Sequence, residues 1–226
     1  MRMPSAPETH LLTYNTWTLR VRHGAREGGR LLLLLHGWTG DENSMWVFVR
    51  DFPPRYWLLA PRAPYPASRG GYSWRVIRPG TWGHATLDDL RPSTEALVRF
   101  VDEWSLSVGL GARSFDVMGF SQGGALAAVL SLLYPERVGK VAVLSAFVPE
   151  GAEPYLRDGA LTGKSYFIAH GRLDGLVPPE RARRSVALLE EAGARVTFCE
   201  AEVGHKVGAT CLSALRAFFE EMGAEE

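Results

Sequence analysis

The segment 114–134, SFDVMGFSQGGALAAVLSLLY, constrains the fold of this chain most strongly. Its first part is an apolar run that predicts a buried strand, and its second part repeats apolar residues at helical spacing. Between them stands GFSQG at residues 119–123, a G-x-S-x-G pattern. A strand that turns abruptly into a helix at such a pattern lifts the serine hydroxyl above the sheet. We therefore predict that Ser121 is a nucleophile; the alternative is a glycine-rich turn without a chemical role.

The rest of the chain alternates between short apolar segments and helical segments. Strands are expected at 30–37, 56–60, 138–144, 164–170 and 194–201, and helices at 44–50, 87–108, 179–192 and 209–222. This alternation is typical of an α/β protein with a mainly parallel sheet and helices on both faces. Residues 11–23 alternate like an antiparallel edge strand, with a hairpin turn expected at 23–29. The length of 226 residues suits one domain over 1–226, with 1–10 as a flexible tail.

Composition excludes several classes of partner. The 25 basic and 25 acidic residues balance, without long runs of either sign, so neither a nucleic-acid surface nor a polybasic membrane anchor is indicated. We find no secretory signal and no segment long enough to span a bilayer, and we expect a cytoplasmic protein. Cys199 and Cys211 form no CxxC pattern, so buried thiols are expected, with a disulfide as the less favoured alternative. No metal site and no cofactor are expected.

A nucleophilic serine needs a base, and the base needs an acid that orients it. The strand at 165–170 runs into GRLDGLVP, which places Asp174 in a tight loop at the end of that strand. Asp158 is the competing acid, but no strand ends beside it. His205 follows the last strand and is the one histidine, of six, that comes after Asp174. Since the carboxyl ends of parallel strands meet at one edge, we expect Asp174 and His205 beside Ser121; a turn residue and a surface histidine are the alternatives.

The negative charge that develops during acyl transfer needs N–H donors. The backbone N–H of Gln122, at the start of the helix, is one expected donor. The second is expected from HGWTG at 36–40, where we assign the N–H of Trp38. His36 is expected to brace this loop by hydrogen bonds and not to react.

The long aperiodic segment 62–85 is rich in aromatic residues. A segment of this length inside a domain is more often functional than idle, so we expect Tyr72, Trp74 and Trp82, together with Trp38, to line the substrate site. The alternative is that these rings only pack the loop. The connection 145–163 is too short for a lid domain, so an open site is expected.

Four segments together resemble the small carboxylesterase/phospholipase family of the α/β-hydrolases, which includes the acyl-protein thioesterases. They are LLHGWTGDE at 34–42, GFSQGG at 119–124, HGRLDGLVP at 170–178 and GH at 204–205. The resemblance implies an α/β-hydrolase fold, a triad of Ser121, Asp174 and His205, and oxyanion donors at Trp38 and Gln122. The chain departs from the family in the Trp-rich loop 67–85 and at Trp38, where the family often has a smaller apolar residue.

The expected function is that of a serine hydrolase, which cleaves carboxylic esters or thioesters through an acyl-enzyme. Short- to medium-chain or aromatic esters are the expected small-molecule substrates. One alternative is a peptidase or a perhydrolase that uses the same triad. The other is a hydrolase-like binding module without catalysis. A monomer or a homodimer is expected.

Overall fold

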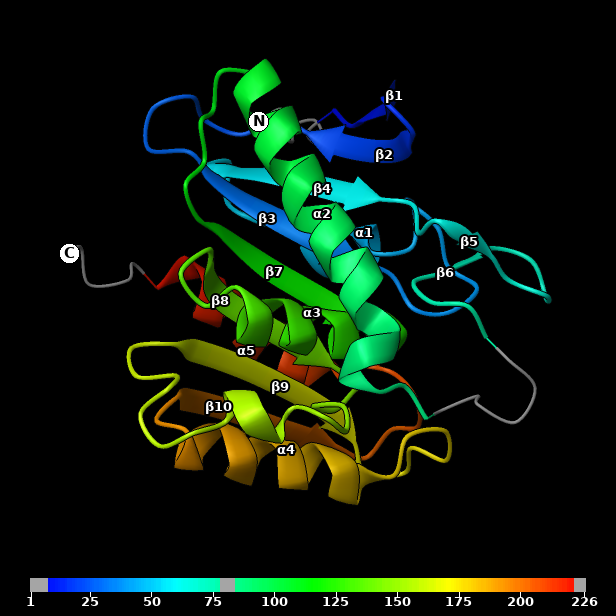
Figure 1. The fold of residues 1–226 in the computed structure, drawn as a ribbon, viewed down its shortest axis with the longest axis vertical. Helices are drawn as coiled ribbons and strands as arrows, with labels where there is room; N and C mark the ends of the chain where they lie inside the picture. The colour runs from blue at the N-terminus through cyan, green and yellow to red at the C-terminus, as the bar shows by residue number, and fades with distance from the viewer. Residues whose placement is uncertain (1–7, 78–83, 222–226) are drawn as a thin grey trace, which may run out of the picture.

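An eight-stranded sheet runs through the computed structural model, which describes residues 8–77 and 84–221 (Figure 1). Its strands are β1 (His10–Tyr14), β2 (Trp17–Arg22), β3 (Arg30–Leu35), β4 (Tyr56–Pro61), β7 (Phe115–Phe120), β8 (Val138–Leu144), β9 (Ser165–Gly171) and β10 (Arg195–Ala201). They lie in the order β1-β2-β4-β3-β7-β8-β9-β10. β1 pairs antiparallel with β2, as does β2 with β4, and the remaining pairs are parallel. The expected mainly parallel sheet is confirmed.

The leucine run in β3 shows why a continuous apolar segment forms a strand here. Leu31, Leu33 and Leu35 belong to the hydrophobic core on one face of the sheet. Leu32 and Leu34 belong to the core on the other face. Because successive side chains of a strand point to opposite faces, a strand covered on both sides needs apolar residues at every position.

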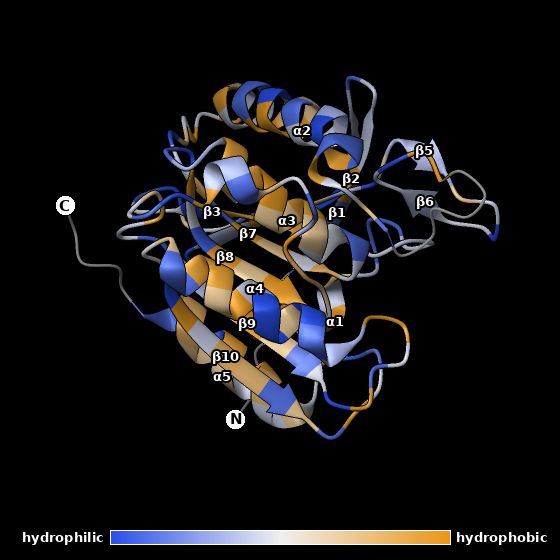
Figure 2. Cartoon of the chain, turned by 60° about the horizontal axis from the view of Figure 1, so that its bottom comes forward, coloured by the Kyte–Doolittle hydropathy of each residue, from blue (hydrophilic) through white to orange (hydrophobic). Residues whose placement is uncertain are grey.

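Helices cover both faces, as expected. On one face lie α2 (Leu87–Ser107), α3 (Gln122–Leu133) and α4 (Pro179–Glu191), and on the other lie α1 (Trp46–Val49) and α5 (Ala209–Glu220) (Figures 1 and 2). α3 is buried along almost its whole length, because it packs against β7, β8 and α2. Its composition of glycine, alanine and leucine fits that position (Figure 2).

Three short elements complete the described chain. β5 (Tyr65–Pro66) and β6 (Tyr72–Ser73) form a separate antiparallel pair that projects from the main sheet (Figure 1). The connection from β8 to β9 holds only the short 3-10 helix η1 (Glu153–Tyr155). The expectation that this connection carries no lid domain is therefore confirmed. No helix of the described residues is long and apolar enough to cross a membrane.

The amino-terminal segment differs from the expectation. Residues 11–23 are not one strand, because the chain reverses after β1 and returns as β2. Asn15 takes a φ of 52° at this reversal, a conformation that asparagine tolerates better than most residues. His10, expected in the tail, already begins β1, and residues 1–7 lie outside the described part.

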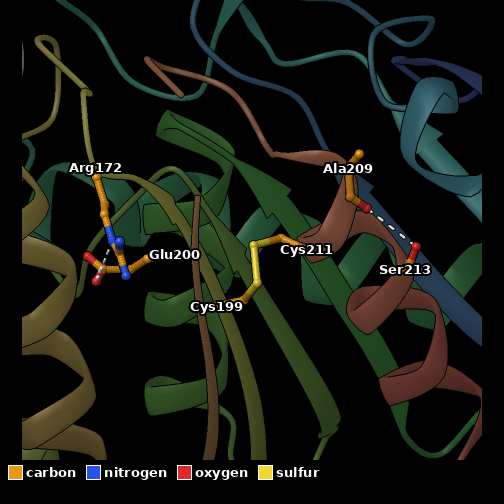
Figure 3. The surroundings of a disulfide bond; sticks show 6 residues. All are labelled: Arg172, Cys199, Glu200, Ala209, Cys211 and Ser213. Atoms are coloured by element: carbon orange, nitrogen blue, oxygen red, sulfur yellow. Dashed lines mark hydrogen bonds and ion pairs between the residues drawn. A yellow bond between two sulfur atoms is a disulfide. The ribbon is translucent and has the colours of Figure 1, made fainter. Parts of the chain in front are cut away.

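The two cysteines form a disulfide bond, so the expectation of free buried thiols is wrong (Figure 3). Cys199 lies on β10 and Cys211 on α5, and their Cα atoms are 5.6 Å apart. The physical reason is that α5 packs directly against β10, which brings together two residues from elements that no sequence pattern pairs. The bond connects the strand and the helix on either side of the loop 202–208, which contains His205.

Candidate active site

Ser121 stands at the sharp turn between β7 and α3, with φ 53° and ψ −119°. A positive φ at a non-glycine residue is strained and is found often at functional sites. The flanking glycines make the turn possible. A Cβ atom on Gly119 would lie 1.9 Å from the carbonyl oxygen of Gly123, and one on Gly123 would lie 2.1 Å from that of Leu35. The G-x-S-x-G pattern is thus required by the close approach of strand and helix.

The structure brings together the three side chains predicted from the sequence. The Nε2 atom of His205 lies 2.9 Å from Ser121 Oγ, and its Nδ1 atom lies 2.7 Å from Asp174 Oδ2. A carboxylate only accepts hydrogen bonds, so Nδ1 donates to Asp174 and Nε2 accepts from the serine hydroxyl. This arrangement leaves the imidazole in the tautomer that can take the serine proton.

Asp174 is buried and held by its own loop. Its Oδ1 atom accepts hydrogen bonds from the backbone N–H groups of Leu176 and Val177, both at 2.9 Å. Burial raises the pKa of Asp174, but the hydrogen bonds from Val177, His205 and Leu176 outweigh it and leave the pKa below its usual value. The carboxylate is therefore charged at neutral pH and can stabilise a protonated His205.

His36 braces the loop after β3, as predicted. It is buried, its Nε2 atom accepts from the backbone N–H of Ala63 at 3.0 Å, and its Nδ1 atom donates to the carbonyl oxygen of Gly37 at 2.7 Å. Burial lowers the pKa of His36, which favours the neutral form that this pattern requires.

The braced loop runs directly against the nucleophile. A Cβ atom on Gly37 would lie 3.3 Å from Ser121 Cβ. Trp38 and Gln122, the two expected oxyanion donors, line the same cavity as Ser121 and His205. Their donor roles stay predictions, to which this placement lends support.

The cavity beside Ser121 has a volume of about 420 Å³. Most of its lining is apolar, from Ile77, Ala85, Phe120, Ala125, Phe147, Leu176 and Val177. Two arginines, Arg69 and Arg75, also line it. Sequence reasoning missed both, since an arginine in an aperiodic loop carries no signal of the direction it faces.

Of the expected aromatic wall, Trp38 lines this cavity, whereas Tyr72 and Trp74 do not. Trp74 is fully buried, and its Nε1 atom donates to the carbonyl oxygen of His36 at 2.8 Å, so it packs beneath the site. Tyr72 lines a different pocket, where its hydroxyl accepts a hydrogen bond from Arg62 at 3.1 Å. Trp82 lies outside the described residues. For Trp74 and Tyr72 the expectation of a substrate wall is wrong, because hydrogen bonds hold both side chains elsewhere.

The competing acid, Asp158, lies exposed in the turn between η1 and β9. Asp174, in contrast, is 5% exposed and contacts the imidazole of His205. Of the two candidates, Asp174 is the one that the structure brings to the histidine.

Comparison with known proteins places this chain in one family. The model of the phospholipase/carboxylesterase family matches residues 18–222, and the chain belongs to this family of α/β-hydrolases. It is similar to a probable carboxylesterase of Oryza sativa subsp. japonica, with 28% identity over 202 residues, 83% of this chain and 75% of the relative. A second rice relative, named a probable inactive carboxylesterase, is 27% identical over 194 residues, 79% of this chain and 77% of the relative.

An acyl-protein thioesterase 1 of Eremothecium gossypii is 25% identical over 187 residues, 74% of this chain and 75% of the relative. Among solved structures, a carboxylesterase from Mesorhizobium loti is similar with a TM-score of 0.78 and 26% identity. The similarity covers 93% of this chain and 98% of that one. The expected α/β-hydrolase fold is confirmed.

Proposed function

We propose that this protein is a serine hydrolase that cleaves carboxylic esters or thioesters through an acyl-enzyme. The observation that carries the proposal is the continuous hydrogen-bonded chain from Ser121 Oγ through His205 to Asp174. Membership in a family whose relatives are named carboxylesterase and acyl-protein thioesterase supports it.

In the first half-reaction, Ser121 Oγ attacks the carbonyl carbon of the substrate while His205 Nε2 takes the hydroxyl proton. The charge on the carbonyl oxygen is held by the backbone N–H groups of Trp38 and Gln122. The tetrahedral intermediate then collapses, the bond to the alcohol or thiol breaks, and His205 gives its proton to the leaving group. Asp174 orients the imidazole and stabilises its charge.

In the second half-reaction, water takes the place of the departed alcohol or thiol. His205 removes a proton from the water as it attacks the acyl carbon, and a second tetrahedral intermediate forms. When that intermediate collapses, the proton returns to Ser121 Oγ and the carboxylic acid leaves. The mostly apolar cavity of about 420 Å³ supports short- to medium-chain or aromatic esters as substrates.

The test is the variant Ser121→Ala. We expect it to fold, to lose hydrolysis of para-nitrophenyl esters, and to lose labelling by a fluorophosphonate probe, because that probe reacts with an activated serine. Ser213→Ala, an exposed serine on α5, is the matched control and keeps both signals. Wild-type protein that neither hydrolyses esters nor takes the label would support the alternative of a hydrolase-like binding module, despite the geometry of Ser121, His205 and Asp174.

Peptide and peroxide substrates separate the remaining alternatives. A peptidase or a perhydrolase would use the same three residues, so the ratio of peptide cleavage or peracid formation to ester hydrolysis decides between them. We expect ester hydrolysis to be the fastest. Rapid cleavage of peptides with slow hydrolysis of esters would overturn the assignment.

We also propose that the chain forms one domain, that the protein is a monomer or a homodimer, and that it is located in the cytoplasm. The Cys199–Cys211 disulfide bears against the expected location, because disulfides are rare in reducing compartments. Gel filtration measures the oligomeric state, and thiol labelling of the protein in its native cells measures whether the bond is formed there.

A further inference from the structure

We infer that the candidate active site accepts esters which carry a carboxylate, and that Arg69 and Arg75 bind this group. The inference rests on the proposed esterase function and names the class of substrate. It is carried by the charge of the cavity and by the way in which the chain holds Arg75 in the same cavity as the nucleophile.

The cavity beside Ser121 has an uneven distribution of charge. Arg69 and Arg75 line it, whereas no aspartate or glutamate is found among its described lining residues. Asp174, the acid of the triad, is buried on the far side of His205 and does not line the cavity. A substrate that enters therefore meets an apolar wall and two positive charges. An anionic group is attracted into such a site, and a cationic group is repelled.

Hydrogen bonds fix the backbone around Arg75 to the catalytic elements. The side chain of Gln122, the residue after the nucleophile, accepts from the backbone N–H of Trp74 at 2.8 Å and donates to Ser73 Oγ at 3.0 Å. Ser73 Oγ in turn donates to the carbonyl oxygen of Arg75 at 2.7 Å. Arg75 is thus held by the same turn that holds Ser121. A charge in a fixed position binds its partner with a smaller loss of conformational entropy.

The side chain of Arg75 is buried, with 4% of its surface exposed, although it carries a charge. Its Nη1 atom lies 3.9 Å from Asp89 Oδ2, and that oxygen also accepts the backbone N–H of Thr86 in the cap of α2. Burial lowers the pKa of Arg75, and Asp89 opposes this effect. A substrate carboxylate at the cavity wall would add a charge-assisted hydrogen bond to a group that is already desolvated.

Arg69 has a different place. It lies exposed in the turn between β5 and β6 and also lines the cavity. An exposed guanidinium contributes less to affinity than a buried one, because water and salt screen it. We therefore expect Arg75 to determine most of the selectivity for esters that carry a carboxylate over neutral esters, and Arg69 to add a smaller part.

The experiment compares charged esters with neutral esters of similar size. With the carboxylate on the acyl side, the pair is para-nitrophenyl hemiadipate and para-nitrophenyl hexanoate. With the carboxylate on the leaving group, the pair is para-acetoxybenzoate and para-acetoxybenzamide. The measured quantity is the ratio of kcat/KM for the charged ester to kcat/KM for the neutral ester. We expect a ratio of about 10 or more in at least one pair, and that pair identifies the side of the ester that faces the arginines.

Three variants connect the ratio to the residues. Arg75→Gln is expected to lower it about tenfold, Arg69→Gln by a smaller factor, and Arg75→Lys should retain part of it. Arg26→Gln removes an exposed arginine between β2 and β3, at the opposite edge of the sheet, and should leave the ratio unchanged. If Arg75→Gln does not fold, the variants Arg75→Lys and Arg69→Gln still test whether the arginines produce the preference for charged esters. The salt dependence of the wild-type ratio tests the same point.

Two results would overturn the inference. One is a wild-type ratio near or below 1 in both pairs. The other is a high ratio that both arginine variants leave unchanged. In either case hydrolysis of the neutral esters and fluorophosphonate labelling of Ser121 would persist, so the proposed esterase function would stand. If the proposed esterase function itself were wrong, the wild-type protein would neither hydrolyse the neutral esters nor take the fluorophosphonate label.

Discussion

Gln122 follows the nucleophile, and its backbone and side chain have different tasks. The backbone N–H is a proposed oxyanion donor, while the side chain bonds to Ser73 and the N–H of Trp74. Gln122→Ala keeps the donor and removes both bonds, so kcat/KM should fall about tenfold, the effect of one or two lost hydrogen bonds. Steady-state kinetics measures this. Ser73→Ala is the comparison: it removes the bond from the Gln122 side chain and the bond to the carbonyl oxygen of Arg75, but leaves the bond from Gln122 to the N–H of Trp74. A loss as complete as in Ser121→Ala would contradict this division of tasks.

Asp174 links the site to stability in acid. Its pKa is lowered in the folded state, so its bonds add stability above the unfolded value of about 4, and this stability disappears as the pH falls through the lower, folded value. Asp174→Asn has no such titration. We expect the difference in Tm between wild type and this variant to shrink as the pH is lowered from 7 towards 3, as measured by circular dichroism. A constant difference would contradict the assignment.

The same variant tests the catalytic role of Asp174. Asparagine cannot stabilise a protonated His205, and its amide can hold the imidazole in the wrong tautomer. A corresponding change in a serine protease lowers kcat by about 10⁴. We expect a loss of about 10³ or more in kcat here, with fluorophosphonate labelling much slowed. Asp158→Asn, at the exposed rival position, is the control and should behave as wild type.

At the scale of elements, the disulfide between β10 and α5 closes a short loop that contains His205. Such a loop loses conformational freedom in the unfolded chain, which stabilises the folded state by about 3 kcal/mol. Cys199→Ser should therefore lower the free energy of unfolding by about this amount, measured by denaturation in urea. Wild type treated with a reductant should behave like the variant. An unchanged stability in both would show that α5 holds the loop without the bond.

Most elements were predictable because their signals are local. The leucines of β3, the helical spacing of α2 and the proline at the start of α4 each identify one element. The reversal between β1 and β2 was missed although the sequence signals it, because two consecutive polar residues, Asn15 and Thr16, interrupt the alternation and asparagine is common in turns. The disulfide was missed because its pairing depends on how α5 packs on β10, which no spacing encodes.

In the candidate site, too, some residues were predictable from the sequence and others were not. Ser121, Asp174 and His205 were predictable because each follows a strand at one edge of the sheet, and topology brings such positions together. Trp74 and Arg75 are neighbours in an irregular loop, and the sequence does not reveal that the ring faces the core while the arginine lines the cavity. Their directions depend on hydrogen bonds to distant residues.

For the whole molecule, the two edges of the sheet have different roles. The carboxyl edge holds the candidate site, while near the amino edge the buried Asp116 binds Arg30, the hydroxyl of Tyr56 and the backbone N–H of Lys140. Burial, together with the charge of Asp116, raises the pKa of Tyr56, which keeps its hydroxyl a donor. These contacts join β3, β4, β7 and β8 and contribute to stability, not to chemistry.

Asp116→Ala should therefore cost about 3 kcal/mol or more of unfolding free energy, because it leaves buried donors without their acceptor. Below the transition temperature, kcat/KM should stay near the wild-type value. The control is Asp102→Ala, which removes an exposed partner of Arg137 and should cost less than about 1 kcal/mol. Urea denaturation with parallel kinetics measures both. A large loss of kcat/KM in folded Asp116→Ala would show that the two edges are coupled.

The covalent link between β10 and α5 also matters for anyone who produces this protein. A recombinant host with a reducing interior would accumulate the dithiol form, whereas export to an oxidising compartment or oxidation after lysis would yield the bridged form. Batches from the two routes would have the same sequence and differ in mass by two hydrogen atoms. Their thiol content therefore has to be titrated before rates or melting curves from different preparations are compared.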